Sequence, residues 1–365
     1  MKKSQIILGI VCCMLFCACE PQTSVSSPDG KLSVACSVDS MGRPIYQVSM
    51  NGQDIIRPSQ LGLQFAQTDL SEGFTLLRTQ RDQHNETWET TWGEDHYIVN
   101  HYNQLSLFLR HRSGIEMQVC FRVFNDGWAM RYMLPEMADT VLINECTSYQ
   151  FAKEPTVWSI PWRTEYYEAL WQPAPMSEID TVCSPITLQW GDNLYAWMHE
   201  AALYDYPAQN YYYADGQLRT YLTPWSSGDA AYLTTPFATP WRMMVLSNEL
   251  SGLVESRMLL NLNEPCKIED TSWIKPMKFI GIWWGMHLET MTWHQGPIHG
   301  ATTENMKRYI DFAADNGFGG VLAEGWNTGW EDWGKPDVVA QFSFTTPYSD
   351  YDLEYLTNYA HQRGV

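Results

Sequence analysis

The segment IEMQVCFRVF (residues 115–124), followed after a short polar break by AMRYML (129–134), decides the fold of most of the chain. Apolar and polar residues alternate in both segments, which is the period-two pattern of strands with one packed and one solvated face. The pattern recurs between Asn, Asp, Gly and Pro residues in KLSVACSV (31–38), PIYQVSMNG (44–52), TWETTWG (87–93), QLSLFLRHR (104–112), LYAWMHEAAL (194–203), AAYLTTP (230–236) and WRMMVLS (241–247). So many antiparallel strands predict a large β-sandwich over residues 24–270.

The sequence pattern changes near Pro265. MKFIGIWW (277–284) is a continuous apolar run of strand length. The next long segment predicts a helix that Thr302 or Thr303 caps and that Asn316-Gly317 closes. Its apolar residues repeat at helical spacing, as Met306, Ile310 and Ala313.

A second strand and helix follow in the same order. GGVLAE (319–324) predicts a buried strand, and a helix with Leu353, Leu356 and Ala360 on one face begins near Asp350 and stops at Gly364. Strand and helix in alternation indicate a parallel sheet with crossover helices, so residues 275–365 are expected to be the first two βα units of a (β/α)8 barrel. Such a barrel takes about 250 residues, and we therefore expect this chain to be the front part of a longer protein.

Composition narrows the class of protein. The chain has 365 residues with 42 Asp+Glu against 23 Lys+Arg, a formal net charge of −19, which argues against a nucleic-acid partner because it would repel a phosphate backbone. Hydrophobic residues make up 45% and charged residues 18%, so the chain has enough apolar surface to fold. The 17 Trp and 20 Tyr fit a β-rich protein with surfaces that can stack on sugars.

The first nineteen residues have the form of a secretory signal. Lys2 and Lys3 precede an apolar stretch from Ile6 to Phe16, which is too short for a membrane-spanning helix. Cys19 follows a small residue, as in a bacterial lipoprotein processing site, and is predicted to be lipidated and to anchor the chain to a membrane. The alternative is ordinary cleavage nearby with a free periplasmic product. The five later cysteines show no CxxC spacing and predict neither a zinc site nor a disulfide framework.

Glu324 is the first candidate site residue. It ends a predicted barrel strand, where the reacting groups of βα barrels lie, and Trp326 and Asn327 follow in the loop. A carboxylate beside polar groups and aromatic faces suits recognition of a sugar ring. Further along this loop, Glu331 and Asp332 are more readily explained as solvated carboxylates.

The first βα unit offers aromatic and polar candidates. Trp283 and Trp284 end its predicted strand, so at least one should face the barrel mouth. The loop that follows holds His287, His294 and His299, which could bond sugar hydroxyls or could simply pack within the loop.

Other chemistries lack their motifs. His199-Glu200 has no second His four residues later, so it is not a zinc-protease helix, and from the residues alone Glu200 is more readily a strand carboxylate than a metal ligand. The chain shows neither a Gly-rich phosphate loop nor a GxSxG elbow, which disfavours phosphoryl and acyl transfer.

Several long motifs resemble glycoside hydrolase family 97. They are FRVFNDGWAMRY (121–132), HEAALYDYP (199–207), TPWR (239–242), NLNEP (261–265), SWIKPMKFIGIWWGMH (272–287), HGATTENMKRYIDFAADNG (299–317) and VLAEGWNTGWEDW (321–333). The resemblance implies a β-super-sandwich joined to a calcium-dependent (β/α)8 barrel, secreted to the periplasm or held as a lipoprotein in a Gram-negative bacterium. It also implies an oligosaccharide substrate.

The resemblance favours one branch of the family. GIWWGMH, HGATTENMKRY and VLAEGWN look like the inverting α-glucosidases of starch utilisation, and the WDWW and DEGW signatures of the retaining α-galactosidases are absent from the sequence. An α-galactosidase and a non-catalytic sugar-binding lipoprotein remain alternatives. Inverting enzymes use a carboxylic acid and a carboxylate base. By resemblance both lie beyond Val365.

Two residue roles carry over from the family. Glu200 resembles a sandwich-domain Glu that binds Ca²⁺, a cation that takes oxygen ligands, and this reverses the interpretation from the residues alone. Glu324 resembles the second-strand Glu that contacts the sugar at the cleavage subsite. The substrate-binding set is therefore predicted to be Glu324, Trp283, Trp284, His299, Trp326 and Asn327, with Glu200 as the metal ligand.

Overall fold

The computed structural model describes residues 23–164, 166–333, 335 and 342–365. Its contacts divide the chain into two units, one that ends at Cys266 and one that begins at Lys267. Each unit is described by itself. In the described ranges no helix has both the length and the apolar character needed to cross a membrane.

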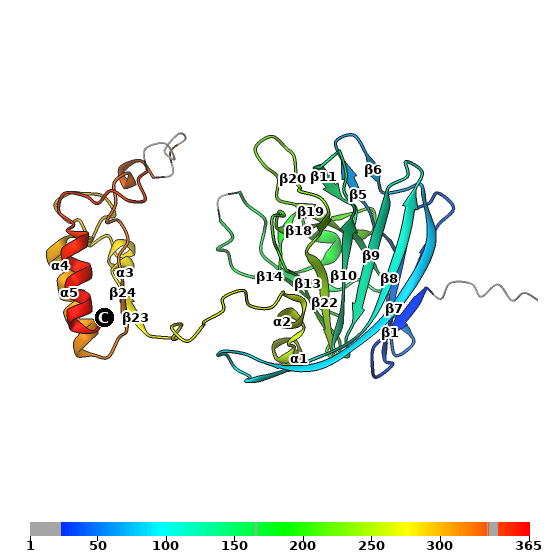
Figure 1. Ribbon diagram of the computed structural model, residues 1–365, viewed down its shortest axis with the longest axis horizontal. Coiled ribbons are helices and arrows are strands. Elements are labelled where there is room, and N and C mark those ends of the chain that lie inside the picture. The colour runs from blue at the N-terminus through cyan, green and yellow to red at the C-terminus, as the bar shows by residue number, and fades with distance from the viewer. Residues whose placement is uncertain (1–22, 165, 334, 336–341) are drawn as a thin grey trace, which may run out of the picture. The chain divides into compact units, whose positions relative to one another are not determined.

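The first unit is built on two large antiparallel sheets (Figure 1). The first sheet has eight strands, which in spatial order are β1 (Ser24–Ser26), β2 (Leu32–Val38), β3 (Pro44–Met50), β4 (Gln53–Gln60), β12 (Ser148–Phe151), β19 (Gln217–Leu222), β18 (Gln209–Ala214) and β15 (Val182–Cys183).

The second sheet has ten strands. In spatial order they are β14 (Gln172–Pro175), β13 (Thr156–Ser159), β16 (Ile186–Gln189), β17 (Tyr195–Ala201), β22 (Trp241–Ser247), β10 (Gly127–Leu134), β9 (Glu116–Val123), β8 (Tyr97–His111) and β7 (Phe74–Glu89), with β21 (Phe237–Ala238) also paired to β10. A smaller sheet has the order β20 (Ala231–Tyr232), β11 (Val141–Glu145), β5 (Leu63–Phe65) and β6 (Asp69–Leu70).

The apolar faces of the sheets form one core. Tyr46 of the eight-stranded sheet packs against Trp128 and Phe121 of the ten-stranded sheet, with ring centroids 5.2 and 5.8 Å apart. All three side chains are almost completely buried. This is the packing of a sandwich, in which alternate residues of each strand point inward.

Two short helices cover part of the outer face of the ten-stranded sheet. They are α1 (Leu250–Glu255) and α2 (Met258–Leu262), and both contact β17 and β22. The core beneath them includes Met243 and Val245, which alternate with the inward-facing Met244 along β22.

The prediction of a β-sandwich is confirmed, and most of its strands fall where the alternating pattern places them. Two segments differ: TWETTWG holds only the end of β7, and AAYLTTP only the two residues of β20. Most of β7 escaped prediction because most of its side chains are solvent-exposed beyond Phe74, so its sequence carries no apolar alternation. It pairs with β8 along the whole strand in the long hairpin visible in Figure 1.

The second unit contains a parallel strand pair and its helices. β23 (Phe279–Gly281) pairs in parallel with β24 (Gly320–Leu322), and α4 (Thr303–Asp315) packs against both strands and against α5 (Leu353–Arg363). The predicted order of strand, helix, strand and helix is confirmed. Short helices α3 (Trp283–His287) and η2 (Trp330–Asp332) lie in the loops that follow the two strands, and η1 (Met176–Glu178) belongs to the first unit.

The limits of the two long helices follow from their caps. The Thr302 side chain accepts a hydrogen bond from the Asn305 backbone at the start of α4, as predicted for this position. In α5 the Asp352 side chain caps the start, and Gly364 ends the helix in the left-handed conformation at φ 77°. Leu356 is buried, but Leu353 is exposed, so the predicted apolar face of α5 is narrower than its sequence indicates.

The predicted first strand of the barrel is wrong at its end, where Trp283 and Trp284 lie. The sequence predicts a strand through Trp284, but β23 ends at Gly281 and the two tryptophans form the first turn of α3. The apolar run alone could not show where the strand ends, because such a run looks the same in a strand and in a helix. Here β23 stops where its three-residue partner β24 stops, and the apolar residues beyond it fold into a helix.

Candidate functional site

Glu324 lies just after β24, at the end of the parallel strand pair where the sequence predicts a site. Its side chain is half-buried, and Oε2 accepts a hydrogen bond of 3.1 Å from the indole Nε1 of Trp293. Trp293 belongs to the loop that follows β23 and α3. The bond therefore joins the loops at the carboxyl ends of both strands, where the binding sites of βα barrels are built.

Aromatic rings continue from Trp293 on both sides. Trp293 stacks on Trp330 with centroids 6.2 Å apart and an interplanar angle of 18°, and its other neighbour, His287, lies 6.4 Å away. The His287 ring meets Trp283 edge-on at 3.9 Å, and Trp284 lies 6.3 Å from Trp283. We call Trp283, Trp284, His287, Trp293 and Trp330 the aromatic row.

The aromatic row and Glu324 together offer two kinds of contact. Trp283 and Trp284 are 46% and 63% exposed, so their rings are available to a ligand. Indole faces stack on the apolar face of a sugar, while a carboxylate accepts strong hydrogen bonds from hydroxyl groups. The arrangement suits a neutral ligand that is rich in hydroxyl groups.

His299 and Asn327 lie inside the second unit, where their side chains bond to the protein itself. His299 Nδ1 is 2.9 Å from Asp350 Oδ2, and its Nε2 is 2.8 Å from the carbonyl oxygen of Gly325. The Asn327 amide donates to the Ser343 carbonyl and accepts from the Trp330 indole at 3.1 Å. Since their polar atoms are used within the protein, neither side chain presents a free group to a sugar in this geometry.

Trp326 is also held within the fold. Its ring packs against Tyr351, with centroids 5.8 Å apart, and belongs to the border of the apolar core of this unit. Asp332 pairs with Lys335 on the surface and Glu331 is exposed, as expected for solvated loop carboxylates. Among the described residues, Glu324 is thus linked to Trp283 only through Trp293 and His287, whereas His299, Trp326 and Asn327 contact other parts of the second unit.

Trp293 contacts Glu324 directly but is not among the residues predicted from the sequence. The available signal was a tryptophan in the first βα loop, next to His294 and between histidines that were already candidates. Sequence spacing alone could not show that its indole reaches the second strand end.

Glu200 is the predicted metal ligand and lies on β17, directly opposite Arg242 of β22. Its Oε2 accepts a 2.6 Å hydrogen bond from Arg242 Nη1, and its Oε1 accepts one of 3.1 Å from the Gln209 backbone. The residue is only 6% exposed. It is therefore a buried, charge-paired carboxylate of a strand.

A second carboxylate completes a buried cluster. Glu145, at the end of β11, receives hydrogen bonds from Arg242 Nε at 2.8 Å and from Nη2 at 2.6 Å, and also from Thr147 and Tyr206. We call Glu145, Arg242 and Glu200 the buried triad. With two carboxylates and one guanidinium, the buried triad has a formal charge of −1.

The charges of Glu145 and Arg242 stabilise each other. Burial opposes ionisation of Glu145, but the charge and hydrogen bonds of Arg242 outweigh it, so the pKa of Glu145 lies below its ordinary value. Burial likewise works against the Arg242 cation, yet Glu145 and Glu200 hold its pKa well above the usual value. Both groups are therefore charged at neutral pH.

The described residues do not form a calcium site on their own. Calcium takes six to eight oxygen ligands, whereas Glu200 is one carboxylate and both its oxygens already accept hydrogen bonds. In the ranges that the structure describes, no three His, Cys, Asp or Glu side chains gather as a metal site.

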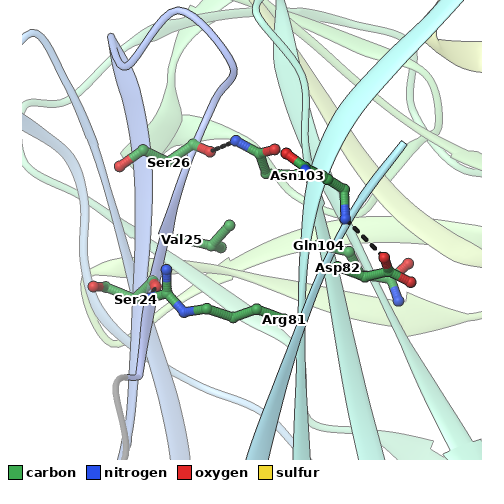
Figure 2. Close-up of a pocket in the computed structure, with 8 residues that line it drawn as sticks. Ser24, Val25, Ser26, Arg81, Asp82, Asn103 and Gln104 are labelled. Carbon is green, nitrogen blue, oxygen red and sulfur yellow. Dashed lines mark hydrogen bonds between the residues drawn. The ribbon is translucent and has the colours of Figure 1, made fainter. Parts of the chain in front are cut away.

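A separate polar cavity of about 580 Å³ lies between β1 and the β7–β8 hairpin (Figure 2). Asn103 Nδ2 donates a 2.9 Å hydrogen bond to the Ser26 carbonyl oxygen, and Arg81 donates to that of Ser24. These bonds join β1, an edge strand of the first large sheet, to β7 and β8 of the second. The cavity contains none of the residues predicted from the sequence, and we assign it a structural role.

Comparison with known families now identifies the chain. Residues 25–265 match the description Glycosyl-hydrolase 97 N-terminal, and residues 283–365 match Glycoside hydrolase 97. The chain belongs to glycoside hydrolase family 97, as its motifs predicted.

Solved structures show the same fold. A Glycoside Hydrolase Family 97 enzyme from Pseudoalteromonas sp. strain K8, solved in complexes with panose and with acarbose, is 38% identical with a TM-score of 0.86. The match covers 94% of this chain and 53% of that one.

Curated relatives are more distant in sequence. A retaining alpha-galactosidase of Bacteroides thetaiotaomicron is 25% identical over 403 residues, covering 100% of this chain and 58% of the relative. A probable retaining alpha-galactosidase of Streptomyces bingchenggensis is 27% identical over 347 residues, covering 93% and 50%. This chain thus spans about half the length of the curated relatives that it matches.

Proposed function

We propose that this chain is part of a glycoside hydrolase that cleaves α-glucosidic bonds of starch-type oligosaccharides with inversion. The observation that carries the proposal is the Glu324 carboxylate, which bonds Trp293 of the aromatic row, whose other members include the exposed rings of Trp283 and Trp284. Glu324 would bond a sugar hydroxyl while the indoles cover the apolar face of the ring.

The choice of glucosides rests on one solved relative. The family member from Pseudoalteromonas was crystallised with panose, an oligosaccharide of α-linked glucose, and at 38% it shares more of this sequence than the curated galactosidases do. The GIWWGMH and VLAEGWN motifs support the same branch.

An α-galactosidase remains a second candidate, because both curated relatives carry that name. A catalytically silent sugar-binding lipoprotein is a third candidate, which the lipobox-like segment at Cys19 favours. Cys19 itself lies outside the described residues. The same segment supports a periplasmic or membrane-anchored location in a Gram-negative bacterium.

Calcium dependence is part of the proposal and rests on the family resemblance of Glu200. Glu200 would be the single ligand from the sandwich, so the other ligands must come from outside the described residues. The formal charge of −1 on the buried triad supports the proposal, because a cation would balance it.

Sugar binding by the purified 365-residue chain is the first test. Titration with acarbose, followed by tryptophan fluorescence, should show saturable quenching, since Trp293 bonds Glu324 and Trp283 and Trp284 belong to the same aromatic row. Glu324→Gln should weaken this binding about tenfold or more, because a charged hydrogen bond is worth about 1.5–3 kcal/mol. Glu331→Gln, in the same loop but exposed, should bind like wild type, because its amide oxygen can still accept the hydrogen bond of Tyr348. Equal binding by both variants would remove Glu324 from the site.

Hydrolysis is the second test. The 365-residue chain should not turn over a nitrophenyl α-glucoside, because by resemblance its acid and base lie beyond Val365, and turnover above background would contradict this. In a protein that also contains the remaining barrel strands, the α-glucoside should be cleaved faster than the α-galactoside, and NMR should show an inverted first product. The reverse preference with retention would favour the galactosidase.

A further inference from the structure

We propose that His299 is a positioning residue that holds the turn at Glu324 and Gly325 in place, and with it the Glu324 carboxylate. The inference rests on the proposed role of Glu324 in sugar binding. His299 lies just before α4 and does not touch Glu324 itself; it acts through the backbone of the neighbouring Gly325.

The His299 side chain is 0% exposed and both ring nitrogens have partners. Nε2 lies 2.8 Å from the Gly325 carbonyl oxygen, and because a carbonyl can only accept, Nε2 must donate. Nδ1 lies 2.9 Å from Asp350 Oδ2, and the Tyr348 ring stands edge-on to the imidazole at 5.2 Å. These contacts leave the ring one orientation.

The turn that His299 holds is tightly packed on its other side. Gly325 has φ +74°, and a Cβ there would lie 2.4 Å from the carbonyl oxygen of Trp293. Trp293 also donates its indole hydrogen bond to Glu324. The turn is therefore clamped between Trp293 and His299, and movement of the Gly325 carbonyl would move the carboxylate of the preceding residue.

Asp350 connects this clamp to the helices. Its carbonyl oxygen accepts hydrogen bonds from the backbone N of Thr303 at 2.8 Å and from Thr303 Oγ1 at 3.0 Å, within the first turn of α4. His299 thus ties together the start of α4, the turn after β24 and the segment before α5. Displacement of a site group by about 1 Å can cost about a hundredfold in rate, so such a clamp has functional consequence.

A matched pair of variants separates the two contacts. Gln places its amide near the position of histidine Nε2, so His299→Gln keeps a donor for Gly325 and loses the bond to Asp350. Asn places its amide near Nδ1, so His299→Asn keeps the Asp350 contact and leaves the Gly325 carbonyl without its donor. Both variants shrink or reshape the same buried side chain, so a purely structural role predicts similar losses for both.

The first readout is acarbose affinity, measured by tryptophan fluorescence. We expect His299→Asn to weaken binding tenfold or more relative to wild type and His299→Gln to stay within about threefold, with similar falls of both melting temperatures. Equal affinities of the two variants would overturn the proposal.

The second readout does not depend on a sugar. The near-UV circular dichroism of the Trp293–Trp330 stack should change in His299→Asn and stay near wild type in His299→Gln. Spectra that change equally, or not at all, would overturn the positioning role. If the spectra separate as expected while wild type fails to bind acarbose, His299 still positions the turn and the proposed function is the part that fails. Glu324→Gln is the control, since it should lose binding and keep the spectrum.

Discussion

Arg242 Nη1 lies 2.6 Å from Glu200 Oε2, and the two residues are direct cross-strand neighbours on β22 and β17. The side chains are 1% and 5% exposed, so the ion pair is shielded from water. Arg242 also bonds Glu145 on β11 of the small sheet, and so the buried triad joins two sheets of the sandwich. The residue predicted to bind a metal is thus part of the sandwich's own framework.

Removal of the central cation should destabilise the sandwich strongly. Arg242→Met leaves two buried carboxylates without their cationic partner, and breaking a buried ion pair in this way costs about 3–5 kcal/mol. Urea unfolding should show this loss. Arg257→Met is the matched control: it removes the ion pairs to the more exposed Glu94 and Asp95, and the cost should stay within about 1 kcal/mol. Similar small losses in both variants would mean that the triad contributes little to stability.

Acid should weaken the fold through His111. Burial, followed by the nearby charge of Arg112, lowers the pKa of His111 below its ordinary value of 6.5. Its Nδ1 accepts a 3.2 Å hydrogen bond from the Ser113 backbone, which requires the neutral ring. Between the folded-state pKa and 6.5 the unfolded chain binds more protons, so stability falls as pH is lowered through that window.

The matching variant for this prediction is His111→Asn, whose side-chain oxygen can accept from Ser113 without titrating. Free energies of unfolding measured from pH 7.5 to 5 should fall less steeply for the variant than for wild type. Parallel pH profiles would show that His111 is not a source of acid sensitivity.

Local sequence patterns predicted much of the fold. Alternation of apolar residues located β9, β10 and β22, and the caps at Thr302 and Gly364 set helix limits, because each signal depends on residues near one another in the chain. The prediction of a strand through Trp284 was wrong, because an apolar run has the same appearance in a buried strand and in a buried helix until its packing partners are known.

The candidate site was predictable only in part, because its contacts are long-range. Arg242 and Glu145 are 97 positions apart, and spacing gives no sign of their bond. His299 and Asn327 have the residue types that bind sugars, but burial assigns their polar atoms to loop support. Residue type and loop position located Glu324, whereas which side chains stay exposed depends on the tertiary fold.

Membrane attachment through Cys19 can be tested directly. The residue lies outside the described ranges, and the prediction rests on the apolar segment and small residue before it. Wild-type protein expressed with its own signal should partition into detergent, whereas Cys19→Ser should remain in the aqueous phase. Stable anchoring takes more than one acyl chain, and the variant lacks the thiol that would carry the lipid. Equal partitioning of both proteins into the aqueous phase would indicate ordinary cleavage.

Glu200→Gln tests whether the buried triad has a second role in calcium binding. Both Glu200 oxygens accept hydrogen bonds, and an amide can accept with only one atom, so the substitution should cost about 1–3 kcal/mol of stability. If Glu200 is also a ligand, calorimetric titration of a protein with the complete barrel should show weaker calcium binding in the variant. Activity should then need more free calcium and recover as calcium is added, because mass action still fills a weakened site. If Glu200 serves only Arg242, the stability loss should appear alone and the calcium curves of variant and wild type should superimpose. That result would remove Glu200 from the metal site and leave it as the structural partner of Arg242.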